Sequence, residues 1–219
     1  MSKFQFVVFD WDGTLMDSIG RIVSSMQRTA EHIGLAVPSE QATKDIIGLS
    51  LEPAIERLFG VLDSQKKQIF LERYKDEYVT LNTVASPMFD DAVNSLEALR
   101  SSNVQLGVAT GKARRGLDRV WQETNMAQFF PYSRCANESK GKPNPDMLIE
   151  LMHEAGYSPD NTVMVGDSIH DMKMASAAGV FPIGVTMGAH RADQLKAAGA
   201  EYIASSLTEL SNFILKERL

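Results

Sequence analysis

The sequence contains a single cysteine, Cys135, among its 219 residues. No intrachain disulfide can form, and a zinc site built from several thiolates is excluded. Apolar runs long enough to span a bilayer are missing as well. The first residues lead directly into an apolar run, without the basic region and small-residue cleavage site of a signal peptide. These absences predict a protein of the reducing cytoplasm that has no membrane partner.

Positive charge is also scarce. The chain has 22 lysines and arginines against 28 aspartates and glutamates, which gives a formal net charge of -6, and it has no long basic run. This balance argues against nucleic acid as a partner, so any anionic ligand must be held by a local site. The hydrophobic fraction of 44% and charged fraction of 23% are ordinary for a folded globular protein. The length allows one large domain, or a moderate domain with a smaller one inserted.

Short apolar runs alternate with helical patterns over most of the chain. The first run, Phe4 to Phe9, does not alternate with polar residues, which is typical of a strand buried on both faces. Later runs occur at residues 104–109, 162–165, 181–185 and 201–204. This βαβ pattern predicts an α/β fold, a Rossmann-like parallel sheet with helices on both faces. Pro182 suits a strand near the edge of that sheet.

The segment after the first strand has a different pattern. Its apolar residues recur at helical spacing from Ile19 to Ile33, where Gly34 is a plausible stop, and again at 55–62 and 70–81. No strand pattern interrupts it. We therefore predict an α/β core domain formed by residues 1–15 and 86–219, and an inserted all-helical cap domain over residues 16–85.

Polar residues follow several of the apolar runs, and ligands of open parallel sheets bind at the carboxyl ends of the strands. The candidate groups are Asp10-Trp11-Asp12-Gly13-Thr14-Leu15, Thr110-Gly111-Lys112, Lys142-Pro143 and Gly166-Asp167-Ser168-Ile169-His170-Asp171. Two carboxylates two residues apart can face one pocket only if the chain turns, and Gly13 permits that turn.

A cation is implied by the carboxylates of these groups. Asp10, Asp12, Asp167 and Asp171 would repel one another unless a positive charge offset them, and hard oxygen ligands suit Mg²⁺. Such a site favours phosphoryl chemistry, because the same charge lets a carboxylate approach phosphorus. Lys142 and the hydroxyl of Thr110 would then bind the non-bridging oxygens.

The combined motifs resemble the haloacid dehalogenase superfamily, in the branch similar to phosphoglycolate phosphatase. The pattern consists of DxDGT at residues 10–14, a threonine at 110, a lysine before proline at 142 and GDxxxD at 166–171. Each motif alone is weak. Their order and spacing cover nearly the whole chain, so the joint match is specific.

The resemblance implies a Mg²⁺-dependent phosphatase that hydrolyses a small-molecule phosphate monoester, such as phosphoglycolate, through an aspartyl-phosphate. It implies that Asp10 is the nucleophile, that Asp12 is the acid and base, and that the insert is a mobile cap. The implied Mg²⁺ ligands are Asp10, the backbone carbonyl of Asp12 and Asp167, with Asp171 in support. The implied phosphoryl-binding residues are Thr110, Gly111 and Lys142.

One segment of the insert predicts substrate contacts. Residues 47–51 join two helical stretches and include the turn-permissive Gly48, as in the cap loop that contacts the leaving group in this branch. Arg57 follows within about two helical turns. We predict that it binds an acidic group of the substrate; the alternative is a solvated arginine on an amphipathic helix.

Other interpretations remain open at this stage. An acid at position 12 favours a phosphatase, but a phosphomutase or pyrophosphatase would use the same intermediate. A receiver-like domain or a catalytically silent phosphate-binding module belongs to another functional class, and the late GDxxxD motif disfavours the first. Lys140 competes with Lys142 for the phosphate role, Lys112 is either a phosphate ligand or a solvated lysine, and His170 is interpreted as structural. The chain is expected to be a monomer or a homodimer.

Overall fold

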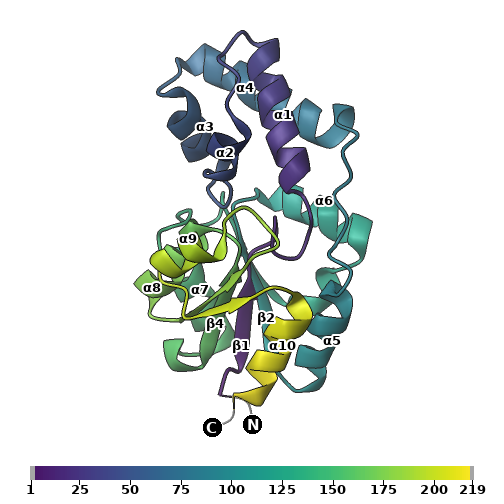
Figure 1. Ribbon diagram of the computed structural model, residues 1–219, viewed down its shortest axis with the longest axis vertical. Coiled ribbons are helices and arrows are strands. Elements are labelled where there is room, and N and C mark those ends of the chain that lie inside the picture. Colours follow the sequence, from purple (N-terminus) through teal and green to yellow (C-terminus); the bar gives the residue numbers. More distant parts are fainter. Residues whose placement is uncertain (1–2, 218–219) are drawn as a thin grey trace.

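A six-stranded parallel sheet forms the centre of the molecule in the computed structural model, which describes residues 3–217 (Figure 1). The strands are β1 (Phe6–Phe9), β2 (Gln105–Thr110), β3 (Tyr132–Cys135), β4 (Thr162–Gly166), β5 (Phe181–Val185) and β6 (Tyr202–Ala204). Their order is β3-β2-β1-β4-β5-β6, and every neighbouring pair is parallel. The predicted α/β fold is confirmed.

β1 lies between β2 and β4 and is buried on both faces. Val7 and Phe9 pack into one apolar cluster, whereas Phe6 and Val8 pack into another on the opposite face. Residues of α5, α6 and α10 complete the first cluster, and residues of α7 and α8 complete the second. The helices and single turns of this part are α5 (Ala92–Ser101), α6 (Arg114–Thr124), η2 (Ala127–Phe129), α7 (Asp146–Ala155), η3 (Pro159–Asn161), α8 (Ile169–Ala178), α9 (Ala192–Ala197) and α10 (Leu207–Lys216).

Only helices lie between β1 and α5 in the element order. They are α1 (Ile19–His32), α2 (Glu40–Lys44), α3 (Leu51–Phe59), α4 (Ser64–Asp76) and the π-helical η1 (Glu77–Leu81). Residues of α1, α3, α4 and η1 form a further apolar cluster, which also includes Ala189 of the core; Met26, Ile55 and Phe70 are almost fully buried in it. Figure 1 shows them as a lobe beyond the carboxyl ends of the strands, opposite the two chain termini. This placement puts the lobe over the edge where ligands of parallel sheets bind.

The structure differs from the sequence-based expectations at a few boundaries. The first strand begins at Phe6, and Phe4, which the sequence placed in it, packs in the core from the preceding loop. β3 was not predicted; three of its four residues are only half-buried, so it lacks the apolar run that marks the other strands. Pro182 lies in β5, one strand from the edge, as expected.

None of the helices within residues 3–217 is sufficiently long and apolar to cross a membrane.

Candidate active site

The chain turns sharply where β1 ends. The N–H of Asp10 still donates to the carbonyl of Val165 at 2.8 Å, and the N–H groups of the next turn fold back onto the carbonyl of Trp11. Gly13 has φ +75°, and a Cβ at this position would overlap the carboxylate of Asp167. Glycine is therefore required twice, for its left-handed backbone and for the close approach of the neighbouring carboxylate.

Three carboxylates meet at this turn. Oxygen atoms of Asp10, Asp167 and Asp171 lie within 4.8 Å of one another, and all three residues are buried. Oδ2 of Asp171 accepts two hydrogen bonds from Ser168, from its hydroxyl at 2.6 Å and from its backbone N–H at 3.1 Å. These two residues form the capping box at the start of α8. Asp167 accepts from the hydroxyl of Thr14 at 3.1 Å and, on its other oxygen, from a backbone N–H. Asp167 and Asp171 are thus held in place by hydrogen bonds.

Lys142 is the cation of this cluster. Its ammonium nitrogen lies 2.8 Å from Oδ1 of Asp10 and 2.6 Å from Oδ1 of Asp171, and its side chain is fully buried. Lys140, the alternative from the sequence, is exposed and pairs with Asp146 at 3.0 Å. Of these two lysines, Lys142 is therefore the one placed beside Asp10.

Thr110 ends β2 and is also buried. Its hydroxyl oxygen accepts a hydrogen bond from the N–H of Lys112 at 3.2 Å, which leaves the hydroxyl proton available as a donor. A Cβ on the next residue, Gly111, would overlap the carbonyl of Leu49, so the loop before α3 packs against this edge of the sheet.

The charges of the cluster do not balance. Burial raises the pKa of Asp10 to about 7, although the neighbouring Lys142 opposes the shift. Burial, together with the nearby Asp10 and Asp171, also raises the pKa of Asp167 well above its usual range. Within residues 3–217, Oδ2 of Asp10 accepts no hydrogen bond. The cluster therefore offers oxygen ligands, one of them unsatisfied. Its three carboxylates carry more negative charge than one ammonium group offsets, and both properties suit Mg²⁺.

Among the described residues, the carboxylate of Asp12 does not belong to the cluster of Asp10, Asp167 and Asp171. It accepts from the hydroxyl of Ser18 at 2.6 Å and pairs with the ammonium group of Lys112 at 2.9 Å. Lys112 in turn donates to the hydroxyl of Tyr78, in η1 of the insert, at 3.2 Å. Lys112, whose role the sequence left open, is therefore an ion-pair partner of Asp12 and is not a solvated lysine.

A cavity of about 900 Å³ adjoins the cluster. Asp10, Asp12 and Gly111 line it, together with side chains from the helical insert. Arg57 does not belong to its wall, and its side chain is exposed on α3. The role of Arg57 in substrate binding stays a prediction.

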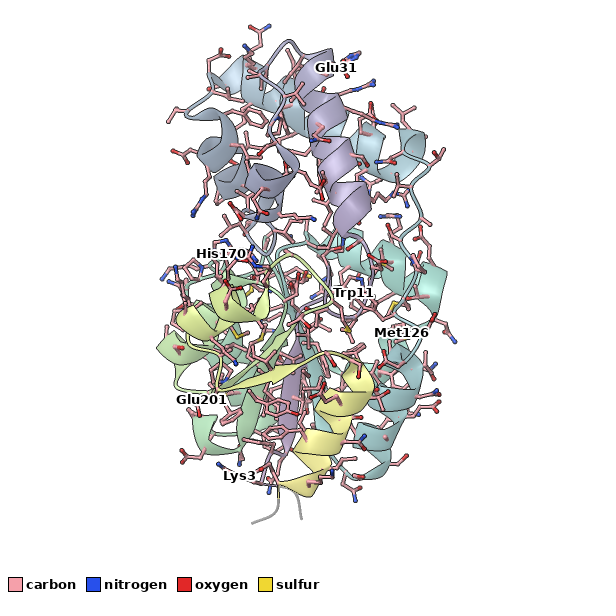
Figure 2. All side chains as sticks on the ribbon, viewed as in Figure 1. Lys3, Trp11, Glu31, Met126, His170 and Glu201 are labelled. Atoms are coloured by element: carbon pink, nitrogen blue, oxygen red, sulfur yellow. The ribbon has the colours of Figure 1, made fainter. Side chains whose placement is uncertain are left out.

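Several contacts of the site were not identified from the sequence. Ser168 had a possible signal, because it stands before a helix with Asp171 three residues later, as in a capping box. Ser18 and the backbone of Ala189 had none, since their contacts with Asp12 and Asp167 exist only in the folded chain. Among the described residues, the His170 ring forms no hydrogen bond with a carboxylate of the cluster; its Nε2 lies 3.1 Å from the carbonyl of Asp45 in the insert. Figure 2 shows His170 at the end of the core that faces the helical lobe.

The haloacid dehalogenase-like hydrolase family model matches residues 7–185. The chain belongs to this family. Among its relatives, the protein named Probable phosphatase IndB, of Dickeya dadantii (strain 3937), is 30% identical over 208 residues, which cover 93% of this chain and 90% of that protein. Phosphoglycolate phosphatase of Vibrio vulnificus (strain YJ016) is 25% identical over 222 residues, 97% of each chain.

Two further comparisons define the range of this similarity. Tyrosine-protein kinase PtkA of Mycobacterium tuberculosis (strain ATCC 25618 / H37Rv) is 30% identical over 205 residues, which cover 93% of this chain and 69% of that protein. The crystal structure of a haloacid dehalogenase-like hydrolase from Bacteroides fragilis superposes with a TM-score of 0.87 at 26% identity, covering 95% of this chain and all of the other. The family, the phosphatase relatives and the buried aspartate cluster agree with the resemblance seen in the sequence. This member of the family is a phosphatase, a hydrolase of phosphoric monoesters.

Proposed function

We propose that this phosphatase is Mg²⁺-dependent and hydrolyses a small-molecule phosphate monoester through a phosphorylated Asp10; phosphoglycolate is the substrate that the sequence resemblance suggests testing first. The observation that supports the proposal most strongly is Oδ2 of Asp10: within residues 3–217 it is buried without a hydrogen-bond donor, its carboxylate lies beside Lys142, and Asp10 lines the cavity. A carboxylate oxygen without a hydrogen-bond donor keeps its lone pairs for attack on phosphorus.

In the first step, Oδ2 of Asp10 attacks phosphorus and the bond to the leaving-group oxygen breaks. Asp12, in its protonated form, transfers its proton to that oxygen, so the product leaves as an alcohol. Lys142 and the hydroxyl of Thr110 bind the non-bridging oxygens, on which negative charge accumulates. Gly111 supports this step by allowing the backbone to come close to the phosphoryl group.

In the second step, water attacks the phosphorus of the aspartyl-phosphate. Asp12, now a carboxylate, accepts a proton from this water, and the bond between phosphorus and Asp10 breaks. Inorganic phosphate is released, and both aspartates return to their starting states. Ser18 and Lys112, which contact the carboxylate of Asp12, keep it oriented for both transfers.

Asp10, the backbone carbonyl of Asp12, Asp167 and Asp171 are the residues that would hold Mg²⁺. When bound, the ion would neutralise charge on the carboxylates and the phosphoryl group. Ser168 and Thr14 hold Asp171 and Asp167 in position for this role.

The proposal extends to the organisation of the chain. Residues 1–15 and 86–219 form the core domain, and residues 16–85 form a cap domain that closes the cavity over the substrate. Arg57 is included as a cap residue that reaches an acidic group only when the cap closes. The protein acts in the cytoplasm, as a monomer or a homodimer, without nucleic acid or membrane partners.

The test is a panel of phosphate esters with purified protein, scored as release of inorganic phosphate with Mg²⁺ and with EDTA. Acid quenching during turnover of a ³²P-labelled ester should trap the label on the wild-type protein and not on Asp10→Asn. Ester hydrolysis that persists in EDTA would remove the metal from the proposal. Label that persists on Asp10→Asn would remove Asp10 as the nucleophile.

A further inference from the structure

The cavity beside Asp10 is large for a two-carbon acid. Its volume of about 900 Å³ lies at the upper end of the range of pockets that bind drug-sized ligands. Most of its wall on the insert side is apolar. The apolar lining residues from the insert include Ile22, Met26, Ile46, Leu49, Tyr74 and Tyr78. A glycolate group offers almost no apolar surface to bury against such a wall.

Aromatic rings form part of this wall. Tyr74 stacks on Phe70 with centroids 6.4 Å apart and an interplanar angle of 17°, and on Tyr78 at 6.0 Å and 29°. Tyr74 and Tyr78 line the cavity, whereas Phe70 is fully buried behind them. The stack therefore brings two rings to the cavity. Cationic groups of Lys112, Arg21 and Arg119 already lie over the Tyr78 ring, at 4.9, 5.6 and 5.8 Å from its centroid, so Tyr74 is the ring more available for contact with a ring of the substrate.

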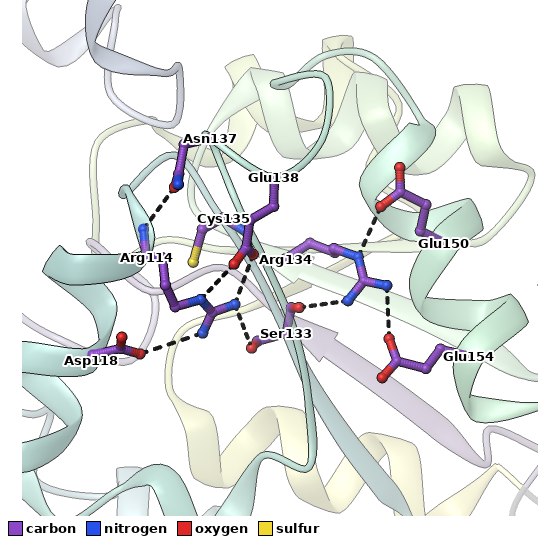
Figure 3. Close-up of polar contacts among 9 residues, drawn as sticks. All are labelled: Arg114, Asp118, Ser133, Arg134, Cys135, Asn137, Glu138, Glu150 and Glu154. Carbon is purple, nitrogen blue, oxygen red and sulfur yellow. Dashed lines mark hydrogen bonds and ion pairs between the residues drawn. The ribbon is translucent and has the colours of Figure 1, made fainter.

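The basic residues of the wall do not form a free anion site. Lys112 pairs with Asp12 at 2.9 Å. Figure 3 shows the guanidinium group of Arg114 between Glu138 and Asp118, with N–O distances of 2.7 and 3.6 Å. Arg119 is likewise engaged, with Glu123 at 2.8 Å. The remaining lining cations are Lys75 and Arg115. Their side chains are exposed, so water already solvates their charge.

We infer that the substrate carries a bulky, ring-bearing and largely apolar leaving group, which occupies the cavity against Met26, Tyr74 and Tyr78 while its phosphoryl group lies at Asp10. The inference rests on the proposed function, because it takes this cavity as the leaving-group site. It follows from the mismatch between an apolar, aromatic wall and an acidic two-carbon group: apolar surface contributes to binding in proportion to the area removed from water.

The test compares 2-phenylethyl phosphate with ethyl phosphate. Both are alkyl esters with alcohols of similar basicity, so they differ mainly in the ring and not in the chemistry of departure. We expect kcat/KM to be about 10- to 100-fold higher for the phenylethyl ester, as burial of one ring predicts. Equal values for the phenylethyl and ethyl esters would overturn the inference.

A matched pair of variants locates the effect. Leu49 and Leu58 are both half-buried leucines of the insert cluster, but only Leu49 lines the cavity. Leu49→Trp should fill part of the cavity and lower the phenylethyl-to-ethyl ratio of kcat/KM by about tenfold, whereas Leu58→Trp should leave that ratio within about twofold. An unchanged ratio in a folded Leu49→Trp protein would place the ring outside this cavity.

Binding separates this inference from the proposed function. Calorimetric titration of Asp10→Asn with the two esters should give a dissociation constant about tenfold or more lower for the phenylethyl ester. If this preference is found but neither ester is hydrolysed by the wild-type protein, the cavity assignment holds and the proposed function fails. If the esters are hydrolysed and Asp10→Asn binds them equally, the inference fails and the proposed function holds.

Discussion

The ammonium nitrogen of Lys112 lies 2.9 Å from Oδ2 of Asp12 and 3.2 Å from the hydroxyl of Tyr78. Lys112 follows β2 in the core, whereas Tyr78 belongs to the helical insert. One ammonium group thus connects the insert to the carboxylate that we propose as the acid and base. Since the side chains of Lys112 and Asp12 are only 10% and 14% exposed, solvent screens this pair little.

Replacing Lys112 should therefore impair catalysis through Asp12. We expect Lys112→Met to lower kcat/KM by about 10- to 100-fold, part of the contribution of a positioned acid and base. The control is Lys140→Met, which removes an exposed lysine and should change kcat/KM by less than about twofold. Melting temperatures of both variants check that they fold. Full activity in folded Lys112→Met would show that Ser18 alone is sufficient to orient Asp12.

The Asp10→Asn substitution should abolish turnover and leave the fold intact. An amide has nearly the shape of the carboxylate but is a poor nucleophile. Phosphate release is measured over long incubations, with the circular dichroism spectrum as the check on folding. Substantial turnover by a clean preparation of this variant is the result that contradicts a covalent mechanism.

Removal of the acid and base should depend on the leaving group. Asp12→Ala should slow hydrolysis of an alkyl phosphate by about 10²- to 10⁴-fold. An activated ester such as p-nitrophenyl phosphate needs little protonation on departure, so its single-turnover phosphorylation of Asp10 should be slowed much less. If both esters lose the same factor in that step, Asp12 is not the acid.

The charge imbalance of the cluster predicts a pH-dependent stability in metal-free protein. The pKa of Asp10 rises from 3.8 to about 7 on folding, so the folded chain retains a proton that the unfolded chain loses between these values. The contribution of Asp10 to the free energy of unfolding is therefore fully present below pH 3.8 and is lost as the pH rises through about 7. The loss is on the order of a few kcal/mol.

The measurement is the melting temperature of wild-type protein and Asp10→Asn in EDTA. The variant should gain stability over the wild type as the pH rises from about 5.5 to about 8, because it has no carboxylate to ionise. Saturating Mg²⁺ should stabilise the wild type at the higher pH by binding the folded state. A difference between the two proteins that does not change with pH would contradict the burial of a charged Asp10.

Arg57→Ala tests the sequence-based assignment of that residue. If closure of the cap brings the exposed Arg57 to an acidic group, kcat/KM should fall by about tenfold for phosphoglycolate and by less than about twofold for p-nitrophenyl phosphate. Parallel values for the two esters would leave Arg57 as a solvated residue of α3.

The sequence by itself determined the fold class and the composition of the site. Parallel strands that are buried on both faces appear in the sequence as apolar runs, such as Phe6–Phe9. The polar residues that follow each run lie at the edge of the sheet where ligands bind. Asp10, Asp12, Asp167 and Asp171 were predicted together for this reason. The structure brings together the carboxylates of Asp10, Asp167 and Asp171, whereas that of Asp12 pairs with Lys112. β3 was missed because an edge strand that is half-buried needs no apolar run.

Only the tertiary structure decided which partners these residues have. The pairing of Lys112 with Asp12 and the choice of Lys142 over Lys140 depend on how loops from different strands meet. The apolar character of the cavity depends on which faces of the insert helices point toward Asp10. Helical periodicity shows that a face is apolar, but it does not distinguish a face that packs in a core from one that lines a cavity. Contacts between residues distant in the chain leave no local pattern, and here they define the site.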